Sequence, residues 1–322
     1  MNIANAMTDL IGNTPLLRLN RLAPNANLAV KLECFNPLSS AKARAALYRL
    51  NAGEEAGLLR EGTVIIEHTS GNTGVGLAYI AALRGYHLSL TMPDTMSQER
   101  RSLLAALGAE LVLTEGAKGM QGAVDKANEL AAAYPSAFIP GQFDNPANAR
   151  AHYETTGPEI WRDTDGQVDL FVASVGTGGT LTGTGRYLKE QNPNIQVAAV
   201  EPDASPLLSG GQAGPHQIQG IGANFIPSVL DRSVYDQIVR VKDADGFAMG
   251  RSAARREGIL VGVSSGAALW AAGALAKRPA YAGKTIVVLL PDSGARYLSS
   301  PFFPVHHHPP PPNPPPSFFP PR

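Results

Sequence analysis

Short runs of β-branched and other apolar residues alternate with longer amphipathic stretches along most of the chain. Strands are expected at 28–33, 63–67, 87–91, 110–113, 168–174, 196–200, 237–241 and 284–289. Helical periodicity appears between them, for instance at 73–84, 97–107, 119–133, 180–190 and 267–277. Strands that alternate with such helices predict right-handed crossovers and parallel sheets. An α/β fold of this kind binds ligands beyond the carboxyl ends of its strands, so the strand-to-helix turns matter most.

The chain has 322 residues, which favours two domains. Turn-forming residues at 142–149 suggest a hinge, so we expect α/β domains at 1–145 and 146–300, each a twisted sheet flanked by helices. Residues 301–322 differ in composition, because they hold eleven of the 26 prolines. We expect this segment to be a disordered, polyproline-type tail outside the fold.

Composition excludes several functions. Lys and Arg together number 27, as do Asp and Glu, so no basic excess favours nucleic acid or an anionic membrane surface. No apolar run is long enough to cross a membrane. The single cysteine, Cys34, cannot form an internal disulfide, which favours a reducing, cytoplasmic setting. His152 and His216 lack the spacing of metal ligands, and no metal is expected.

The turn Gly-Thr-Gly-Gly-Thr at 176–180 follows an apolar run and begins a helix. Glycines let backbone N–H groups converge on an anion, and the helix N-terminus adds partial positive charge. The turn lacks the lysine of a nucleoside-triphosphate loop and the spacing of a dinucleotide motif, so a monophosphate fits better. Considered alone, it is equally consistent with a glycine-rich turn that binds nothing.

Three further turns can be interpreted together with the turn at 176–180. Donor-rich residues at 69–74 suit a carboxylate, Lys42 falls in the first turn of a helix, and 262–266 places two serines before another helix. A lysine at the positive end of a helix has a lowered pKa, and its neutral amine can form a Schiff base. Individually these are better explained as N-caps and a solvated lysine. Together they are the parts needed to hold pyridoxal phosphate and an amino acid.

Longer motifs occur in a characteristic order: I-G-N-T-P-L at 11–16, M-S-Q-E-R-R at 96–101, Q-F-D-N-P-A-N at 142–148, T-T-G-P-E-I-W at 155–161, I-Q-G-I-G-A-N-F-I-P at 218–227 and R-Y-L-S at 296–299. With them the chain resembles the cysteine synthase (O-acetylserine sulfhydrylase) family of fold-type II pyridoxal-phosphate enzymes. The resemblance implies a fold similar to the tryptophan synthase β subunit, in which residues near 13–34 cross into the other sheet. It also implies a homodimer.

The resemblance implies a role for each turn. Lys42 would hold pyridoxal 5'-phosphate as a Schiff base and later act as general base, while Asn72 would bind the ring hydroxyl oxygen. Ser264 would face the pyridine nitrogen, with Ser265 as second choice. The phosphate-binding residues would be Gly176, Thr177, Gly178, Gly179 and Thr180. The substrate carboxylate would be held by Thr69, Ser70, Gly71, Thr73 and Gln142.

The implied reaction is cysteine biosynthesis from O-acetyl-L-serine and sulfide. Loss of acetate would give an α-aminoacrylate, and sulfide addition would give L-cysteine; a neutral serine at the ring nitrogen suits such prompt β-elimination. Alternatives are a serine or threonine dehydratase of the same fold and a catalytically weakened paralogue that acts as a binding partner. Motifs of both A-type and B-type synthases are present, and the A-type commonly binds serine acetyltransferase, which makes that enzyme a candidate partner.

Two features depart from the family. The chain reads Ser-Ala-Lys-Ala-Arg at 40–44, where the family usually has Asp after the lysine. Ala43 removes a charge that favours a helix start, so we expect cofactor binding with reduced activity. The proline-rich tail is the second departure, and we expect truncation at Ser300 to preserve cofactor binding and any activity.

Overall fold

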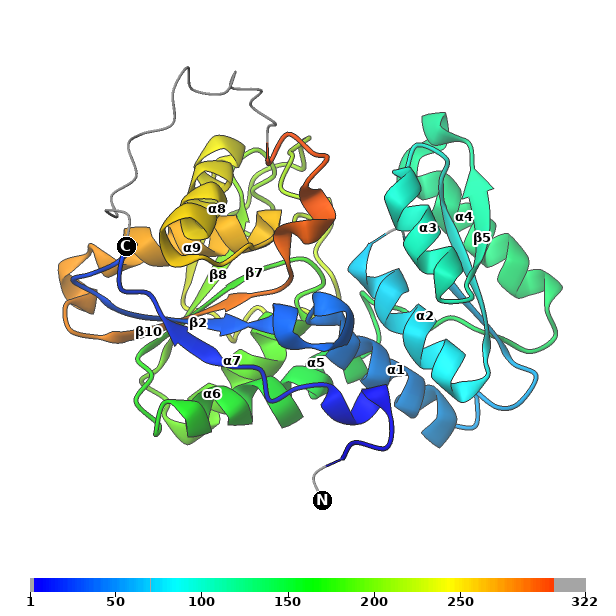
Figure 1. The fold of residues 1–322 in the computed structure, drawn as a ribbon, viewed down its shortest axis with the longest axis horizontal. Coiled ribbons are helices and arrows are strands. Elements are labelled where there is room, and N and C mark those ends of the chain that lie inside the picture. Colours follow the sequence, from blue (N-terminus) through cyan, green and yellow to red (C-terminus); the bar gives the residue numbers. More distant parts are fainter. Residues whose placement is uncertain (1–2, 70, 304–322) are drawn as a thin grey trace, which may run out of the picture.

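Two largely parallel sheets organise the molecule in the computed structural model, which describes residues 3–69 and 71–303 (Figure 1). The larger sheet has the order β1 (Leu16–Arg18), β2 (Asn27–Leu32), β10 (Thr285–Leu290), β7 (Leu170–Ser174), β8 (Gln196–Pro202) and β9 (Gln237–Val241). The smaller has the order β5 (Glu110–Thr114), β4 (His87–Pro93), β3 (Val64–His68) and β6 (Ala137–Phe138). Only β1 pairs antiparallel among the described strands, so the predicted α/β fold with parallel sheets is confirmed.

Helices alternate with these strands as the periodicity predicts. The helices are α1 (Lys42–Glu55), α2 (Asn72–Arg84), α3 (Gln98–Ala106), α4 (Gly119–Ala133), α5 (Ala147–Ala151), α6 (Gly157–Asp163), α7 (Gly179–Gln191), α8 (Asp243–Glu257) and α9 (Val263–Ala276). A π-helical turn, η5 (His152–Thr156), joins α5 to α6. The 3-10 turns are η1 (Met7–Leu10), η2 (Glu33–Phe35), η3 (Pro37–Ser39), η4 (Gly116–Lys118), η6 (Pro279–Tyr281) and η7 (Gly294–Tyr297).

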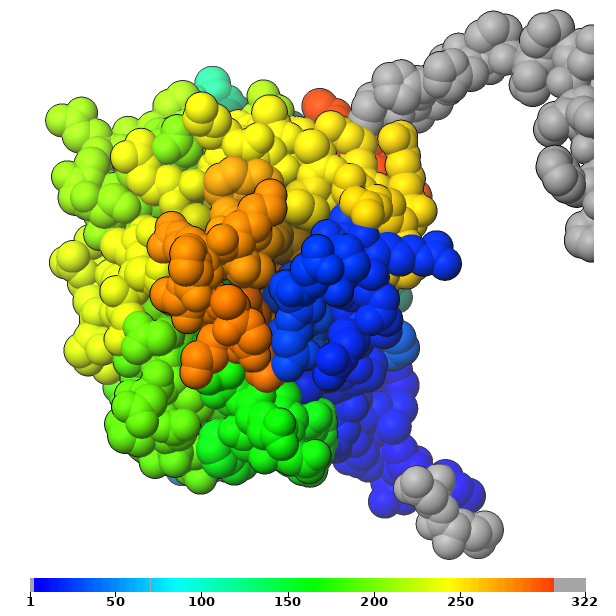
Figure 2. Space-filling model, turned by 90° about the vertical axis from the view of Figure 1, so that its left-hand side faces the viewer, coloured from blue at the N-terminus to red at the C-terminus, as the bar shows by residue number. Residues whose placement is uncertain are grey.

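Helices cover both faces of the larger sheet, with α8 and α9 on one side and α6 and α7 on the other (Figure 1). Successive residues of β7 alternate between them: Val172 packs toward α8 and α9, and Phe171 toward α6 and α7. This two-sided burial explains why the strands read as continuous apolar runs. Figure 2 shows the N-terminal segment, in blue, beside the orange segment that leads into β10, in keeping with the β2–β10 pairing.

The two sheets suggest how the chain divides into the two domains expected from the sequence. We propose one domain around each sheet, with β1 and β2 belonging to the larger sheet because β2 pairs with β10 along its whole length. Among the described residues, no helix combines the length and apolar character needed to cross a membrane.

The local predictions failed where elements are short or packing extends them. The apolar-run analysis missed β1 and β6, which have only three and two residues. The helix expected at 267–277 begins earlier, with Gly262 as its N-cap, so the N-cap interpretation of Ser264 and Ser265 is wrong.

The fold also continues past the expected boundary at residue 300. Phe302 is only 1% exposed and packs against Phe247 and Tyr297, so it belongs to the core, and the expected tail does not begin at residue 301. The rest of the expected proline-rich tail, from residue 304, lies outside the described residues.

Candidate functional site

A cavity of about 460 Å³ lies at the carboxyl ends of strands from both sheets. It gathers most of the residues selected from the sequence: Lys42, Thr69, Gly71, Asn72, Thr73, Gln142, Gly176, Thr177, Gly178, Thr180 and Ser264. Gly179 is buried behind the lining, and Ser70 lies outside the described residues. Four turns, spread over more than 200 residues of sequence, therefore meet around one cavity.

The turn between β7 and α7 is shaped for an anion. A Cβ on Gly176 would lie 2.3 Å from the Gly220 carbonyl oxygen, and one on Gly179 would lie 2.2 Å from Asn148 Oδ1. Gly178 has a φ of +85°, which favours glycine. Within the described chain, the backbone N–H groups of Gly176, Thr177 and Gly178 have no hydrogen-bond acceptor. These free donors beside a helix N-terminus fit a phosphate monoester.

Lys42 is the first residue of α1 and lines the same cavity. Its backbone N–H donates to Ser40 Oγ at 3.2 Å, which fixes the start of the helix. Burial lowers the pKa of its amine, although the nearby Asp292 carboxylate partly opposes this effect. A lysine with a lowered pKa supplies the neutral amine needed to attack an aldehyde.

Polar groups at the start of α2 meet groups from distant segments. Thr73 Oγ1 donates to Gln142 Oε1 at 2.7 Å, and Asn72 Nδ2 donates to Asp292 Oδ2 at 2.7 Å. Thr69 Oγ1 accepts from the Gly71 N–H at 3.3 Å. The Thr69 hydroxyl and the second N–H of Asn72 Nδ2 donate to no described residue, and both residues line the cavity, so the turn keeps hydroxyl and amide donors suited to a carboxylate.

The first turn of α9 separates its two serines. Ser264 lines the cavity, whereas Ser265 is fully buried and its Oγ has no hydrogen-bond partner among the described residues. Of the two serines, Ser264 is therefore the one that borders the cavity.

Sequence reasoning missed Asp292, which is 1% exposed and lines the cavity. Its Oδ2 accepts from the Tyr297 hydroxyl at 2.6 Å as well as from Asn72. Burial raises the pKa of its carboxyl, and these two hydrogen bonds only partly offset the rise. The rule that sites lie at strand ends could have found it, because Asp292 follows β10 by two residues.

The sequence analysis also gave His152 no place in the site. It is buried beneath the anion-shaped turn, with Nε2 3.1 Å from Thr180 Oγ1 and Nδ1 2.9 Å from Thr156 Oγ1. Burial and the neighbouring Arg44 charge lower its pKa to about 3, so the ring is neutral at physiological pH. Across the described residues, no cluster of three or more His, Cys, Asp or Glu side chains is placed to hold a metal ion.

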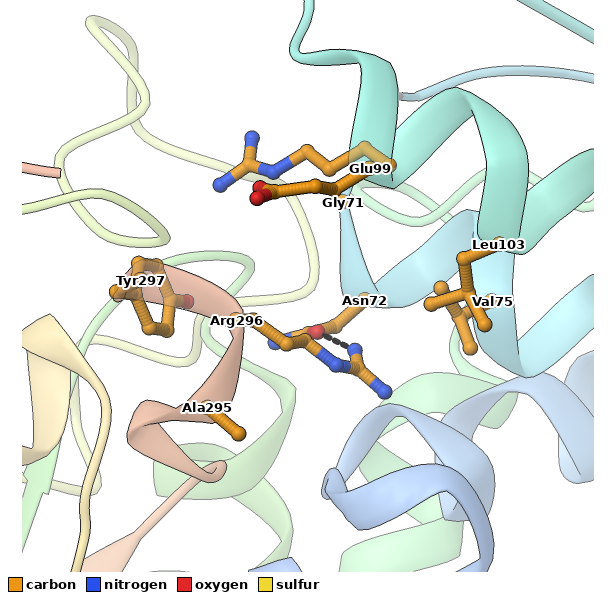
Figure 3. A pocket seen from close by; sticks show the side chains of 9 residues that line it. Gly71, Asn72, Val75, Glu99, Leu103, Ala295, Arg296 and Tyr297 are labelled. Atoms are coloured by element: carbon orange, nitrogen blue, oxygen red, sulfur yellow. Dashed lines mark hydrogen bonds between the residues drawn. The ribbon is translucent and has the colours of Figure 1, made fainter. Parts of the chain in front are cut away.

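A second cavity, of about 330 Å³, adjoins the first (Figure 3). Val75 and Leu103 line its apolar side, and Asn72 and Tyr297 border both cavities. Figure 3 shows the Arg296 guanidinium donating to Asn72 Oδ1. Asn72 is therefore held from two sides.

A buried ionic network secures α1 two residues beyond Lys42. Arg44 donates to Glu33 from Nε at 2.7 Å and from Nη2 at 2.8 Å, and to Glu159 from Nη1 at 2.6 Å and from Nη2 at 2.8 Å. Lys31 Nζ lies 2.8 Å from Glu159 Oε2. Burial alone would raise the pKa of Glu33, but the Arg44 charge holds this pKa at about 2. The network, which we call the Arg44 cluster (Lys31, Glu33, Arg44 and Glu159), joins β2, η2, α1 and α6.

Known proteins resemble the chain along nearly its whole length. A family model described as pyridoxal-phosphate dependent enzyme matches residues 7–292. A cysteine synthase of Staphylococcus aureus strain N315 is 50% identical over 300 residues, covering 92% of this chain and 96% of the relative.

Two solved structures show the same likeness in three dimensions. A cysteine synthase structure from Entamoeba histolytica matches with a TM-score of 0.92 and 43% identity, covering 94% of this chain and 91% of the other. A hydrogen sulfide-producing enzyme of Fusobacterium nucleatum matches with a TM-score of 0.89 and 48% identity, covering 92% of this chain and 99% of the other.

Proposed function

Since this chain belongs to the cysteine synthase family of pyridoxal-phosphate-dependent enzymes, we propose that it replaces the acetate of O-acetyl-L-serine by sulfide and forms L-cysteine. The observation that carries the proposal is the convergence of four turns on one cavity. An anion cradle, a lysine with a lowered pKa, a donor-rich turn and a neutral serine all line it. These are the groups that such a reaction requires.

Each group has a proposed task. The N–H groups at 176–178 and the Thr180 hydroxyl bind the cofactor phosphate, and Asn72 binds the ring hydroxyl oxygen. Bound pyridoxal phosphate would supply an electron sink for the substrate α-carbon. Ser264 offers the ring nitrogen a neutral hydroxyl rather than a carboxylate, which favours rapid departure of acetate over a long-lived carbanion.

Lys42 carries the proton chemistry. Its Nζ is the group that would hold the cofactor aldehyde and, once freed from it, would take the α-proton of the substrate. The lowered pKa keeps Nζ able to accept that proton near neutral pH. Thr69, Gly71, Thr73 and Gln142 would hold the substrate carboxylate in the same cavity that Lys42 lines.

Product analysis tests the proposal. The purified holoenzyme is incubated with O-acetyl-L-serine, with and without sulfide, and cysteine and pyruvate are quantified. We expect cysteine to dominate when sulfide is present. Pyruvate at the same rate in both conditions would indicate a dehydratase, and absence of both products would indicate a binding paralogue.

A second candidate is the release of hydrogen sulfide from L-cysteine, favoured by the likeness to the Fusobacterium nucleatum enzyme. Both activities would use the same cavity: loss of sulfide from L-cysteine reverses the sulfide-addition step, and water would convert the rest of the substrate to pyruvate and ammonia. Sulfide release from L-cysteine, measured beside cysteine synthesis on the same preparation, decides which is faster.

We also propose a homodimer. Met7 and Leu10 of η1 and Phe35 of η2 are exposed apolar residues, and both elements contact η3. Exposed apolar side chains gathered on neighbouring elements are typical of an interaction surface. Light scattering after size-exclusion chromatography should give twice the mass of 33.8 kDa, and Phe35→Glu should shift it toward the monomer.

Two further proposals concern setting and partner. The single half-buried cysteine, Cys34, suits a reducing, cytoplasmic compartment.

The proposed carboxylate-binding turn at 69–74 would also accept the C-terminal carboxylate of serine acetyltransferase. A peptide with that C-terminus should then compete with O-acetyl-L-serine, whereas its C-terminal amide should not.

A further inference from the structure

We propose that Asp292 is a positioning residue, which orients the Asn72 amide toward the cofactor. The inference rests on the proposed function, because it assumes that Asn72 binds the cofactor ring. It follows from the hydrogen bonds around Asp292 and from the place of its segment in the fold.

The backbone around Asp292 connects the turns that line the cavity. The Ala41 N–H donates to the Pro291 carbonyl at 2.8 Å, and the Gly262 N–H donates to the Asp292 carbonyl at 3.1 Å. The Ser293 N–H donates to the Ser39 carbonyl at 3.3 Å. Asp292 thus lies between the turn that carries Lys42 and the helix start that carries Ser264.

The segment before Lys42 also stores strain that these bonds restrain. Leu38 has a φ of 54° and Ser39 a φ of 59°, conformations that cost non-glycine residues free energy. The Arg296 guanidinium donates to the Leu38 carbonyl as well as to Asn72 Oδ1. One arginine therefore couples the strained lysine turn to the Asn72 amide.

The side chain of Asn72 is held at both ends of its amide. Its Nδ2 donates to Asp292 Oδ2 at 2.7 Å, and its Oδ1 accepts from Arg296. A flip of the amide would place a donor against Arg296 and an acceptor against Asp292, so only one orientation is favourable. The second N–H of Nδ2 is left for a group in the cavity that Asn72 lines.

Asp292 is not explained by stability alone. Its Oδ1 is buried without a hydrogen-bond partner in the described chain, beside the position a Gly262 Cβ would occupy. A buried acceptor left unpaired costs free energy, so the favourable hydrogen bonds of this carboxyl are those of Oδ2, to Asn72 and Tyr297. The carboxylate is better explained by what Oδ2 does for Asn72.

A double-mutant cycle tests the proposal on the apoprotein reconstituted with pyridoxal phosphate. The dissociation constant is measured for the wild type, Asp292→Ala, Asn72→Ala and the double variant. We expect each single substitution to weaken binding about tenfold, as for one lost hydrogen bond of about 1.4 kcal/mol. The double variant should be little weaker than Asn72→Ala, because Asp292 acts through Asn72. Losses that multiply, to about a hundredfold, would overturn the proposal.

Two further variants guard against a folding artefact. Asp292→Asn keeps the shape and an acceptor for Asn72, so its affinity should stay within about threefold of the wild type; a loss equal to that of Asp292→Ala would overturn the role of the hydrogen bond. Thr184→Ala is the matched control, since Thr184 also has a buried, unpartnered oxygen but does not line the cavity. Its affinity should not change.

The outcomes separate this inference from the proposed function. A wild-type protein that does not bind pyridoxal phosphate would remove the proposed function itself. Binding that depends on Asn72 but is unaffected by Asp292→Ala would remove only the positioning role. The circular dichroism of the bound cofactor gives a second readout, which should change in Asp292→Ala if the ring is reoriented.

Discussion

Two clusters built around buried carboxyl groups influence Lys42, and they differ in how completely those carboxyl groups are paired. In the Arg44 cluster, both carboxylates accept hydrogen bonds at both oxygens. In the cluster of Asp292, Asn72, Tyr297 and Arg296, one carboxylate oxygen has no partner among the described residues. The carboxylates of the Arg44 cluster are therefore held fully as ion pairs, whereas the carboxyl beside the cavity bonds its neighbours through Oδ2 alone.

The largest expected effect comes from breaking the fully paired cluster. Arg44→Ala leaves the carboxylates of Glu33 and Glu159 without their shared cation, and we expect it to lower the free energy of unfolding by about 3–5 kcal/mol. Urea unfolding monitored by far-ultraviolet circular dichroism measures this. A loss below about 1 kcal/mol, typical of an exposed ion pair, would contradict the structural role.

Removing Phe302 should disturb the cluster of Asp292, Asn72, Tyr297 and Arg296. Phe302 packs on Tyr297, which donates to Asp292, so truncation after Ser300 should lower stability by about 3 kcal/mol and weaken cofactor binding. This reverses the expectation, drawn from composition, that residue 300 is a harmless end point. Truncation after Phe303 is the matched control and should keep the wild-type melting temperature; an equal loss in both truncations would contradict the role of Phe302.

The clusters should also respond oppositely to pH. Glu33 has a pKa of about 2, below its ordinary value of 4.5, so its stabilisation is complete above about pH 5 and is lost as the pH falls toward 2. The pKa of Asp292 is raised, so its contribution becomes less favourable as the pH rises above about 4.

Urea midpoints between pH 2 and pH 8 measure the two contributions. Glu33→Gln should flatten the acid side of the profile, and Asp292→Asn should flatten the opposite slope. A Glu33→Gln profile parallel to that of the wild type would contradict the low pKa of Glu33.

The smallest expected effect comes from Ala43→Asp, which introduces a buried acid that has no partner. Ala43 is 2% exposed and packs with Ala46 and Leu50 in an apolar cluster, so Ala43→Asp should cost about 1–3 kcal/mol of stability. Thermal unfolding of Ala43→Asp beside Ala43→Val measures the cost of the carboxyl. Equal or higher stability of Ala43→Asp would show that a partner for the carboxyl is available there.

Sequence patterns predicted the sheets well, because each central strand is buried on both faces and is therefore a continuous apolar run. The turn motifs predicted the cavity lining, because parallel strands bring their carboxyl ends to one edge. Asp292 was missed because its role depends on Asn72, 220 positions away. Phe302 was missed because average composition hides a single core residue inside a proline-rich stretch.

The central claim, that Lys42 holds the cofactor, can be tested by chemical trapping. The purified holoenzyme is reduced with borohydride, digested and examined by mass spectrometry, with Lys42→Ala treated alongside. We expect a pyridoxyl phosphate group on the peptide that contains Lys42 and no stable adduct in the variant. An adduct on another lysine, or an equal adduct in Lys42→Ala, would contradict it.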